Sequence, residues 1–347
     1  MPRLKTLATG SIVKGELPRG CELCQRGRKS VVFITGLCPR RCFYCPLSEE
    51  RRRDVFYVNE KLLAKVEERE LISEVLKSDS LGAGITGGDP LVKLDRTLYV
   101  IKTLKEYFPD MHIHLYTTGI TLTKTVLSKL EKAGLDELRI HPTPQHWRKI
   151  ELALKESSMD VGAEIPALPG AEEEIKKFAE YLDRIEASFL NINELEFSET
   201  NALALLQRGY QINEDYITAR GSRETALKVL EWAVSNLNLN MHFCPAIVKD
   251  RYQTSLRLYR KAVATAKNYQ QVTDEGLLKY VEVITQKPDK LKQLIPRPLL
   301  EIKKDRAYTS LYFADKLAKL GYEIYIVEES PTPQRQILNR EKYEFQK

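Results

Sequence analysis

Three cysteines lie within eight residues near the start of the chain, at Cys38, Cys42 and Cys45. An apolar segment, residues 31–37, precedes them directly. Thiolates select zinc, copper(I) or iron-sulfur clusters over hard cations, so this segment predicts a metal site. A structural zinc takes four protein ligands, and a cubane cluster ordinarily takes four cysteines. Three thiolates therefore leave one coordination position open for a ligand from outside the segment.

A second motif follows 42 residues after Cys45, where Gly87 and Gly88 precede Asp89 and Pro90. Glycines allow the backbone to approach a ligand closely. An acidic side chain beside them can bind a cationic amine. The glycine pair alone also suits an ordinary turn from a strand to a helix.

The spacing Cys-x3-Cys-x2-Cys, with Tyr44 before the last cysteine and a strand before the first, resembles the signature of the radical S-adenosylmethionine (SAM) enzymes. The resemblance implies a 4Fe-4S cluster on Cys38, Cys42 and Cys45, with SAM chelating the fourth iron. It also implies reductive cleavage of SAM to methionine and a 5'-deoxyadenosyl radical, which abstracts hydrogen from a substrate. A zinc knuckle that lacks one ligand is the alternative for the three cysteines alone.

The resemblance also implies where SAM binds. Gly87, Gly88 and Asp89 match the family's Gly-Gly-Glu-Pro element for the methionyl amine, with Asp89 in place of the usual Glu. The backbone near Tyr44 is expected to contact the adenine.

Polar residues near the ends of later strands complete the implied SAM site. Thr118 and Gly119 are expected at the adenosyl group, and Glu164 and Asn193 at the ribose or the methionyl carboxylate. For Glu164 and Asn193, hydrogen bonds to backbone within the sheet are the alternative. His141 ends a strand, and a loop histidine in a structural role is its alternative.

Short apolar segments alternate with amphipathic ones between residues 28 and 250, which predicts parallel strands connected by helices. The predicted strands are 31–35, 83–86, 112–117, 137–140, 160–165, 189–195 and 240–243. The predicted helices are 60–77, 91–108, 122–133, 145–156, 171–186 and 222–236. Such repeats close into a full or partial barrel, with chemistry at the carboxyl ends of the strands. The resemblance implies an α/β fold with a partial (βα)6-type TIM barrel. Whether the seventh strand is an extension or an edge stays open.

The chain is predicted to have three parts. They are an N-terminal segment 1–27, the barrel 28–250 and a small C-terminal α+β module 251–347. In the module we expect helices at 254–269 and 307–320 and strands at 280–284 and 323–327.

Cys21 and Cys24 form a Cys-x2-Cys pair ahead of the barrel. Such a pair suits a metal, which would need further ligands. Cys244 and His242 offer them, because alternation along a strand places both on one side. A second metal or auxiliary cluster at Cys21, Cys24 and Cys244, a reducible thiol pair, and small core residues remain the three alternatives.

Composition narrows the class of protein. Of the 347 residues 43% are hydrophobic and 29% charged, which is typical of a soluble globular protein. No apolar segment reaches the roughly 18 residues that span a bilayer, and the start of the chain lacks a signal peptide, so we expect a cytoplasmic protein without membrane contact. The net charge of +6 permits an anionic partner, although basic residues such as Arg257 and Arg260 also suit solvated surface.

The motifs together predict a radical SAM enzyme that acts on an unidentified substrate, with a macromolecule such as tRNA or protein favoured. A reductant such as a flavodoxin or ferredoxin is the expected partner. The segments 42–48 and 193–199 resemble those of a mostly archaeal branch related to pyruvate formate-lyase activating enzymes. The alternative function is a non-catalytic iron-sulfur or zinc module that binds RNA. The substrate, the fate of SAM, the role of the C-terminal module and the oligomeric state are not predicted.

Overall fold

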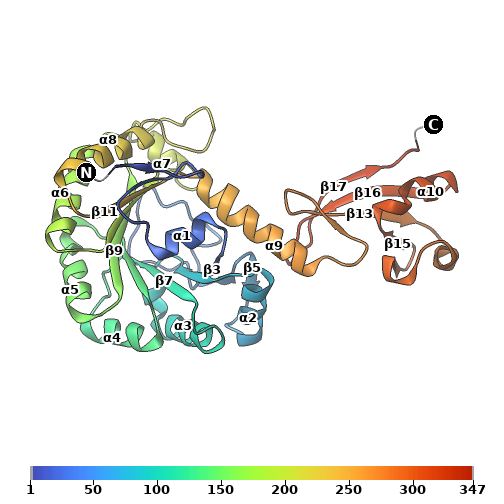
Figure 1. Cartoon of the computed structure of the whole chain (residues 1–347), viewed down its shortest axis with the longest axis horizontal. Coiled ribbons are helices and arrows are strands. Elements are labelled where there is room, and N and C mark those ends of the chain that lie inside the picture. Colours follow the sequence, from blue (N-terminus) through green and yellow to red (C-terminus); the bar gives the residue numbers. More distant parts are fainter. Residues whose placement is uncertain (1–2, 346–347) are drawn as a thin grey trace. The chain divides into compact units, whose positions relative to one another are not determined.

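Seven parallel strands, side by side in chain order, curve around a central space in the first of two units (Figure 1). This computed structural model describes residues 3–345. The first unit comprises residues 3–75 and 80–254, and the second comprises 76–79 and 255–345. The seven strands are β3 (Lys29–Phe33), β6 (Gly82–Thr86), β7 (His112–Thr117), β8 (Glu137–Ile140), β9 (Asp160–Ala167), β10 (Phe189–Glu194) and β11 (Asn240–Cys244).

The predicted fold class, an α/β partial barrel followed by an α+β extension, is confirmed. All seven predicted strands of the barrel are present, with ends shifted by at most two residues. The seventh, β11, pairs in parallel with β10 from Phe189 and Asn240 to Asn193 and Cys244. It therefore continues the barrel sheet.

Antiparallel strands extend both edges of this sheet. β2 (Ile12–Lys14) pairs with β11 and is followed in the sheet by β1 (Lys5–Thr6). At the other edge β3 pairs with β4 (Phe56–Val58), and β4 with β5 (Lys61–Leu63). The prediction of a helix from residue 60 was wrong at its start, because residues 56–63 form a hairpin. Asn59 adopts φ +52° there, which a two-residue hairpin turn requires and Asn tolerates.

Helices connect the parallel strands on the outer side of the sheet (Figure 1). They are α2 (Glu68–Lys77), α3 (Leu94–Tyr107), α4 (Lys124–Ala133), α5 (Arg148–Glu156), α6 (Glu172–Arg184) and α8 (Ser222–Asn236), with short helices η1 (Pro90–Lys93), η2 (Pro144–His146) and α7 (Ala202–Leu206). The apolar side of α3 packs inward, since Ile101 and Leu104 are fully buried. Gly134 ends α4 in the left-handed region at φ +95°, as a C-terminal cap does.

Strand residues alternate between the helices and the barrel interior. In β8 the apolar Leu138 and Ile140 belong to the hydrophobic core, whereas Glu137 and Arg139 are buried polar residues. Because side chains of a strand point to opposite faces in turn, the charged pair faces inward. The interior of this barrel is therefore polar.

The N-terminal residues also belong to the first unit. The seven-residue helix α1 (Arg19–Gln25) lies on the inner side of the sheet (Figure 1) and contacts β3, β6 and β7. It approaches the strands closely, because a Cβ on Gly20 would lie 2.5 Å from Nδ1 of His114. The π-helical segment η3 (Val248–Thr254) also contacts α1.

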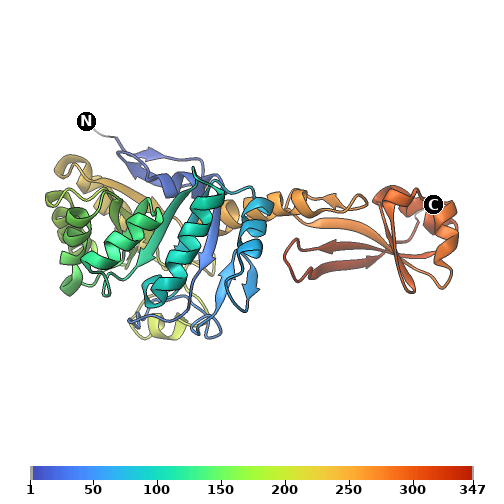
Figure 2. The same cartoon turned by 90° about the horizontal axis from the view of Figure 1, so that it is seen from below.

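The second unit contains a six-stranded antiparallel sheet, whose long strands lie side by side in Figure 2. Its strands are β12 (Gln271–Val272), β13 (Leu278–Ile284), β14 (Leu300–Lys303), β15 (Arg306–Thr309), β16 (Glu323–Glu329) and β17 (Ile337–Lys342). Its helices are α9 (Ser255–Thr265), η4 (Pro288–Gln293), η5 (Arg297–Leu299), η6 (Leu311–Phe313) and α10 (Ala314–Lys319). Leu317 of α10 and Val281 and Ile324 of the strands form part of a second hydrophobic core.

One predicted helix of this unit, 307–320, was too long. Residues 306–309 pair with both β13 and β14 as strand β15. Ser310 then accepts a hydrogen bond from Tyr312 N–H and starts the helical turn η6. No helix among residues 3–345 is long and apolar enough to cross a membrane.

Candidate active site

The three clustered cysteines lie on an irregular segment between β3 and β4, residues 34–55, called here the cysteine loop. The loop is closed at its base, where Gly36 N–H donates to the carbonyl of Arg53 at 2.8 Å. A Cβ on Gly36 would lie 1.6 Å from the Arg51 carbonyl oxygen, so this closure requires glycine. The loop thus begins at the carboxyl end of β3, where barrel chemistry is expected.

All three thiols of the cysteine loop are free and reach the surface, Cys38 exposed and Cys42 and Cys45 half-buried. Cys45 N–H donates to the Cys42 carbonyl at 3.1 Å, which forms a turn between these two cysteines. Three accessible thiols on one short loop suit a soft metal or an iron-sulfur cluster with one open coordination position. The donor set therefore fits the 4Fe-4S cluster predicted from the sequence.

The glycine pair lies directly against the base of the cysteine loop. Gly88 N–H donates to the Thr35 carbonyl at 2.7 Å, and Asp89 N–H donates to the Leu37 carbonyl at 2.9 Å. A Cβ on Gly88 would lie 2.4 Å from the carbonyl oxygen of Gly36. The two sequence motifs therefore form one continuous backbone surface at the base of the cysteine loop.

Asp89 is fully buried, and its carboxylate is directed at the loop after β7. It accepts hydrogen bonds from Leu91 N–H at 3.0 Å, from the Thr117 hydroxyl at 3.0 Å, and from the Thr118 hydroxyl and N–H at 2.6 and 3.1 Å. The structure thus brings Asp89 together with Thr118, and Gly119 follows at φ +79°. The contact of Asp89 with the methionyl amine stays a prediction. The role of Thr117 was missed, because no local pattern links it to Asp89.

His141 holds the cysteine loop to the barrel. Its Nδ1 lies 2.6 Å from the Glu164 carbonyl and its Nε2 lies 2.7 Å from the Tyr44 hydroxyl. Burial and the nearby Arg40 guanidinium lower the pKa of His141 to about 4. The neutral ring therefore donates from Nδ1 to the carbonyl and accepts the Tyr44 hydroxyl at Nε2. Arg40 also donates to the His141 carbonyl at 2.7 Å.

The segment after β10 holds the other side of the cysteine loop. Asn201 Nδ2 donates to the Tyr44 carbonyl at 3.1 Å and to the Glu196 carbonyl at 2.9 Å. Phe43 stacks on Tyr210, and the Arg208 guanidinium lies 4.3 Å from the Phe43 ring centroid. Long-range contacts of this kind fix the backbone at Tyr44, where adenine contact is predicted.

A cavity of about 430 Å³ fills the barrel interior below this loop. Its lining includes Tyr44 of the cysteine loop, Cys21 and Cys24 of α1, and inward residues of the strands. This volume is in the usual range for small-molecule and cofactor sites. Predicted site residues Glu164 and Asn193 both line the cavity.

Glu164 is an anionic group inside this cavity. Its carboxylate accepts hydrogen bonds from Arg139 Nη1 at 3.0 Å, Asn191 Nδ2 at 3.1 Å and Asn193 Nδ2 at 2.8 Å. Burial alone would raise its pKa, but Arg139 and the two asparagines outweigh burial, so the pKa of Glu164 is lowered. The alternative that Glu164 and Asn193 bond only to backbone is not what the structure shows.

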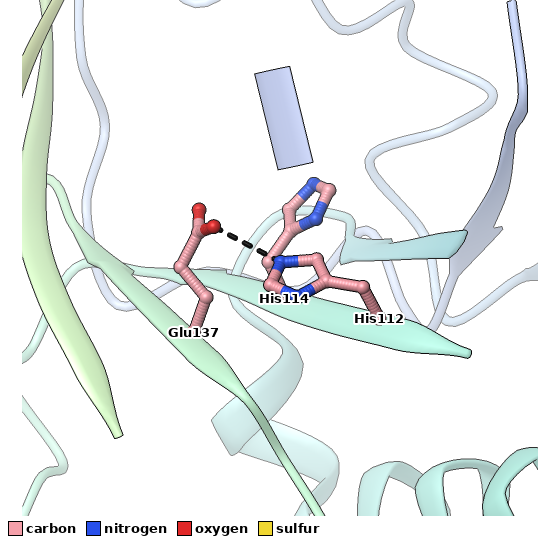
Figure 3. Close-up of side chains that lie close together, drawn as sticks. All are labelled: His112, His114 and Glu137. Carbon is pink, nitrogen blue, oxygen red and sulfur yellow. Dashed lines mark hydrogen bonds and ion pairs between the residues drawn. The ribbon is translucent and has the colours of Figure 1, made fainter. Parts of the chain in front are cut away.

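Arg139 and Glu137 form a buried ion pair at the amino end of the barrel. Glu137 also accepts hydrogen bonds from His112 Nε2 at 3.0 Å and from Gly20 N–H at 3.2 Å. Figure 3 shows His112 and His114 on β7 beside Glu137 on β8. One potential ligand atom from each lies within 4.8 Å of the others. Because Glu137 already accepts from Arg139, His112 and Gly20 and the Arg139 guanidinium is cationic, we assign these residues to the support of α1.

Acidic pH should lower the free energy of unfolding of the protein, because the carboxylate of Glu137 becomes protonated. Burial by itself raises its pKa, yet Arg139 and His112 lower the pKa of Glu137 to about 2. Its stabilising effect is complete above the unfolded pKa near 4.5 and is lost as the pH falls toward 2. Glu137→Gln should therefore lower the free energy of unfolding of the apoprotein by about 3 kcal/mol at pH 7.

Urea unfolding from pH 7 down to pH 2.5 checks this prediction. The gap between wild type and Glu137→Gln should shrink below pH 4.5, where the unfolded glutamate protonates. Glu106→Gln, on the exposed side of α3, is the control and should match the wild type throughout. A gap that is independent of pH would contradict the charge-based account.

The remaining cysteines, Cys21, Cys24 and Cys244, all line the barrel cavity. Burial raises the pKa of Cys21 to about 11, so its thiol is protonated and a poor nucleophile. A reactive thiol pair needs a lowered pKa and access. The arrangement therefore does not favour the reducible thiol pair.

Comparison with known proteins identifies the family. The sequence profile of the Radical SAM superfamily matches residues 32–148. A protein of Methanocaldococcus jannaschii, whose name provisionally describes a glycyl-radical enzyme activating enzyme, is 44% identical over 293 residues, which cover 80% of this chain and 76% of the relative. This archaeal relative confirms the branch suggested by the sequence.

More distant relatives match a smaller share of this chain. A GTP 3',8-cyclase of Limosilactobacillus fermentum is 30% identical over 109 residues, which cover 31% of this chain and 31% of the cyclase. The crystal structure of Streptococcus suis SuiB with its precursor peptide SuiA is 12% identical, with a TM-score of 0.46, over 62% of this chain and 48% of SuiB. Neither says what this chain acts on. The long match to the archaeal relative and the superfamily profile over the three cysteines show that this chain belongs to the radical SAM superfamily.

Proposed function

We propose that this radical SAM enzyme abstracts hydrogen from a protein substrate, as an activating enzyme of a glycyl-radical enzyme does. The observation that carries the proposal is the 44% identity with a relative so named, over 76% of that relative. The surface beside the cysteine loop supports a large substrate. Apolar side chains are exposed on the segment after β10, among them Leu203, Leu206 and Tyr216, and exposed apolar groups in one region mark interaction sites.

Cys38, Cys42 and Cys45 are the residues that would hold the 4Fe-4S cluster. When bound there, the cluster supplies one electron to SAM, whose cleavage yields methionine and the 5'-deoxyadenosyl radical. The backbone of Gly87 and Gly88 lies at the base of the cysteine loop and would position the methionyl group. The chain's remaining task is to bind, to orient and to exclude side reactions.

The walls of the barrel cavity would receive the adenosyl group. Tyr44 and His141, hydrogen-bonded to each other, form its rim next to the cysteine loop. Glu164 and Asn193 lie further along the lining. Enclosure by the sheet would keep water and oxidants from the radical, which has no need of an acid or base for hydrogen abstraction.

An electron donor of acidic surface, such as a flavodoxin or ferredoxin, fits the loop's charge. Arg41, Arg51, Arg52 and Arg53 are exposed arginines of the cysteine loop. Complementary charge steers encounter between proteins. Electron transfer to this enzyme should therefore slow as ionic strength rises.

Glu164 provides a test of the predicted SAM site. A carboxylate has about four acceptor positions, and three are taken by Arg139, Asn191 and Asn193, which leaves one for a ribose hydroxyl. Glu164→Gln removes charge and acceptor capacity, so the Kd of SAM should rise about tenfold, equivalent to 1.4 kcal/mol. Isothermal titration of SAM under anaerobic conditions measures this. An unchanged Kd in a folded variant would remove Glu164 from the SAM site.

Deuterium transfer from the proteins of a labelled cell extract to 5'-deoxyadenosine tests whether the substrate is a protein. The reduced enzyme and SAM are mixed with anaerobic cell extract of the source organism, grown on glycine deuterated at Cα. Deuterium should appear in 5'-deoxyadenosine, and a glycyl radical signal should appear in the electron paramagnetic resonance (EPR) spectrum.

Two treatments of the extract separate the substrate classes. Protease should abolish the deuterium transfer, whereas nuclease and removal of small molecules by filtration should leave it intact. Transfer that nuclease abolishes would contradict the proposal and favour RNA. Transfer that survives in the low-molecular-weight filtrate would favour a small metabolite.

A further inference from the structure

Three thiols from distant parts of the chain line the barrel cavity. Cys21 and Cys24 lie one helical turn apart on α1, and Cys244 ends β11. All three line the same cavity as His242. Thiols and an imidazole are ligands that soft metals select.

Asn191 joins two of these groups. Its Nδ2 donates to the Cys21 sulfur at 3.4 Å and to the Glu164 carboxylate at 3.1 Å, which fixes the orientation of the amide. Its Oδ1 therefore faces Nδ1 of His242, at 3.2 Å. The ring must donate from Nδ1, which leaves a lone pair on Nε2.

Two buried side-chain atoms of the cavity lining have no hydrogen-bond partner among the described residues, Arg139 Nη2 and His242 Nε2. A guanidinium has no lone pair for a metal, so the candidate donor is His242. The side chain is 1% exposed, and Nε2 has no hydrogen-bond partner within residues 3–345. Buried polar atoms are nearly always paired, so an orphaned nitrogen in a cavity wall indicates a ligand. Metal-bound histidines characteristically donate their other ring nitrogen to a fixed oxygen, as His242 does to Asn191.

We propose that Cys21, Cys24, Cys244 and His242 bind a second iron-sulfur cluster inside the barrel. Imidazole can replace thiolate on such clusters. The site goes beyond the proposed function and concerns residues that the SAM reaction does not use.

The spacing of the donors favours a cluster over a single zinc ion. Zinc lies about 2.3 Å from each sulfur, so two ligands of one zinc are at most about 4.6 Å apart. Among the described residues, His112, His114 and Glu137 are the one group whose potential ligand atoms all lie within 4.8 Å of one another. As they stand, the sulfurs of Cys21, Cys24 and Cys244 therefore do not surround a single ion, which leaves a cluster of several irons as the soft-metal alternative.

Two neighbours contact the thiols of α1. The Cys24 thiol donates to Gln253 Oε1 of η3 at 3.0 Å, a hydrogen bond that Cys24 would give up on binding iron as a thiolate. Arg139 Nη1 donates to the Cys21 sulfur at 3.3 Å. Hydrogen bonds and cationic groups near cluster sulfurs raise the cluster potential.

The test begins with the variant Cys38→Ala/Cys42→Ala/Cys45→Ala, which lacks the ligands of the first cluster. After anaerobic reconstitution with iron and sulfide, this variant should still retain iron and sulfide. Its absorption spectrum should show the visible charge-transfer bands of an iron-sulfur cluster. Adding Cys21→Ala and Cys24→Ala should remove the retained iron. A folded three-cysteine variant without iron and sulfide would overturn the proposal, as would stoichiometric zinc in place of iron.

The wild-type protein provides a measurement that does not depend on folding of variants. Mössbauer spectra of the reconstituted enzyme should contain two iron-sulfur components, of which SAM changes only one. A single component that accounts for all iron would overturn the second site. This result would leave SAM cleavage by the first cluster untouched, so the two proposals fail separately.

His242→Gln tests the fourth donor. In this variant, the EPR spectrum or the reduction potential of the second cluster should shift relative to wild type. The signal of the SAM-sensitive cluster should stay the same. His146→Gln is the matched control, because His146 lies on η2 and bonds to Thr143. No shift in His242→Gln would overturn the assignment of His242 as a ligand.

Discussion

Replacing Cys38, Cys42 and Cys45 together by alanine should reduce the formation of 5'-deoxyadenosine from SAM to the background without protein. All three thiols lie on the same loop at the carboxyl end of β3, whose base contacts the Gly87–Gly88 backbone. The reaction depends wholly on one electron from that cluster. Anaerobic incubation with dithionite and SAM, followed by chromatography of the products, measures the effect.

The control for this variant is Ser48→Ala, at an exposed position of the same loop. It should form 5'-deoxyadenosine at the wild-type rate. If the three-cysteine variant is folded and still cleaves SAM, the cysteine loop is not the site of the chemistry. Total iron is a poorer readout, because the proposed second cluster would keep part of it.

Gly88→Ala should have the second largest effect. The new Cβ would lie 2.4 Å from the Gly36 carbonyl oxygen and 2.5 Å from that of Leu37. Both contacts are with backbone at the base of the cysteine loop, so the loop itself must move. Overpacking of this kind costs about 1–3 kcal/mol, and a displacement of 1 Å at a reacting centre can cost about 100-fold in rate.

Thermal unfolding and the rate of SAM cleavage together check the Gly88 prediction. Gly321→Ala is the control, because Gly321 has φ +80° and nothing within 4 Å of a Cβ. This control should lose about 1 kcal/mol of stability through backbone strain and keep its activity. A Gly88→Ala variant that retains wild-type activity would contradict the close packing of the two motifs.

The sequence alone was sufficient to predict the barrel strands and most of the helices that connect them. β7 and β8 were predicted at their observed bounds, because apolar and polar residues alternate along each of them and Gly119 and Pro142 lie two residues beyond their ends. The hairpin β4–β5 was missed, since Lys61 to Leu63 carry the same residue types as the helix that follows. The helix predicted at 307–320 failed because Arg306 to Thr309 are ordered by pairing with distant strands.

The site could be predicted only where its residues form local patterns. Cys38, Cys42 and Cys45 are close in sequence, and the glycine pair has a recognisable context. The partners of Asp89 and His141 come from other strands, so no local pattern identifies them. Likewise, nothing local shows that the charged side chain of Arg139 points into the barrel.

The central claim is that an iron of the cluster on the cysteine loop is left open for SAM. EPR spectroscopy of the dithionite-reduced, anaerobically reconstituted enzyme tests it directly, with and without SAM. We expect a reduced 4Fe-4S signal whose shape changes on addition of SAM. A cluster signal that does not respond to SAM would contradict the account.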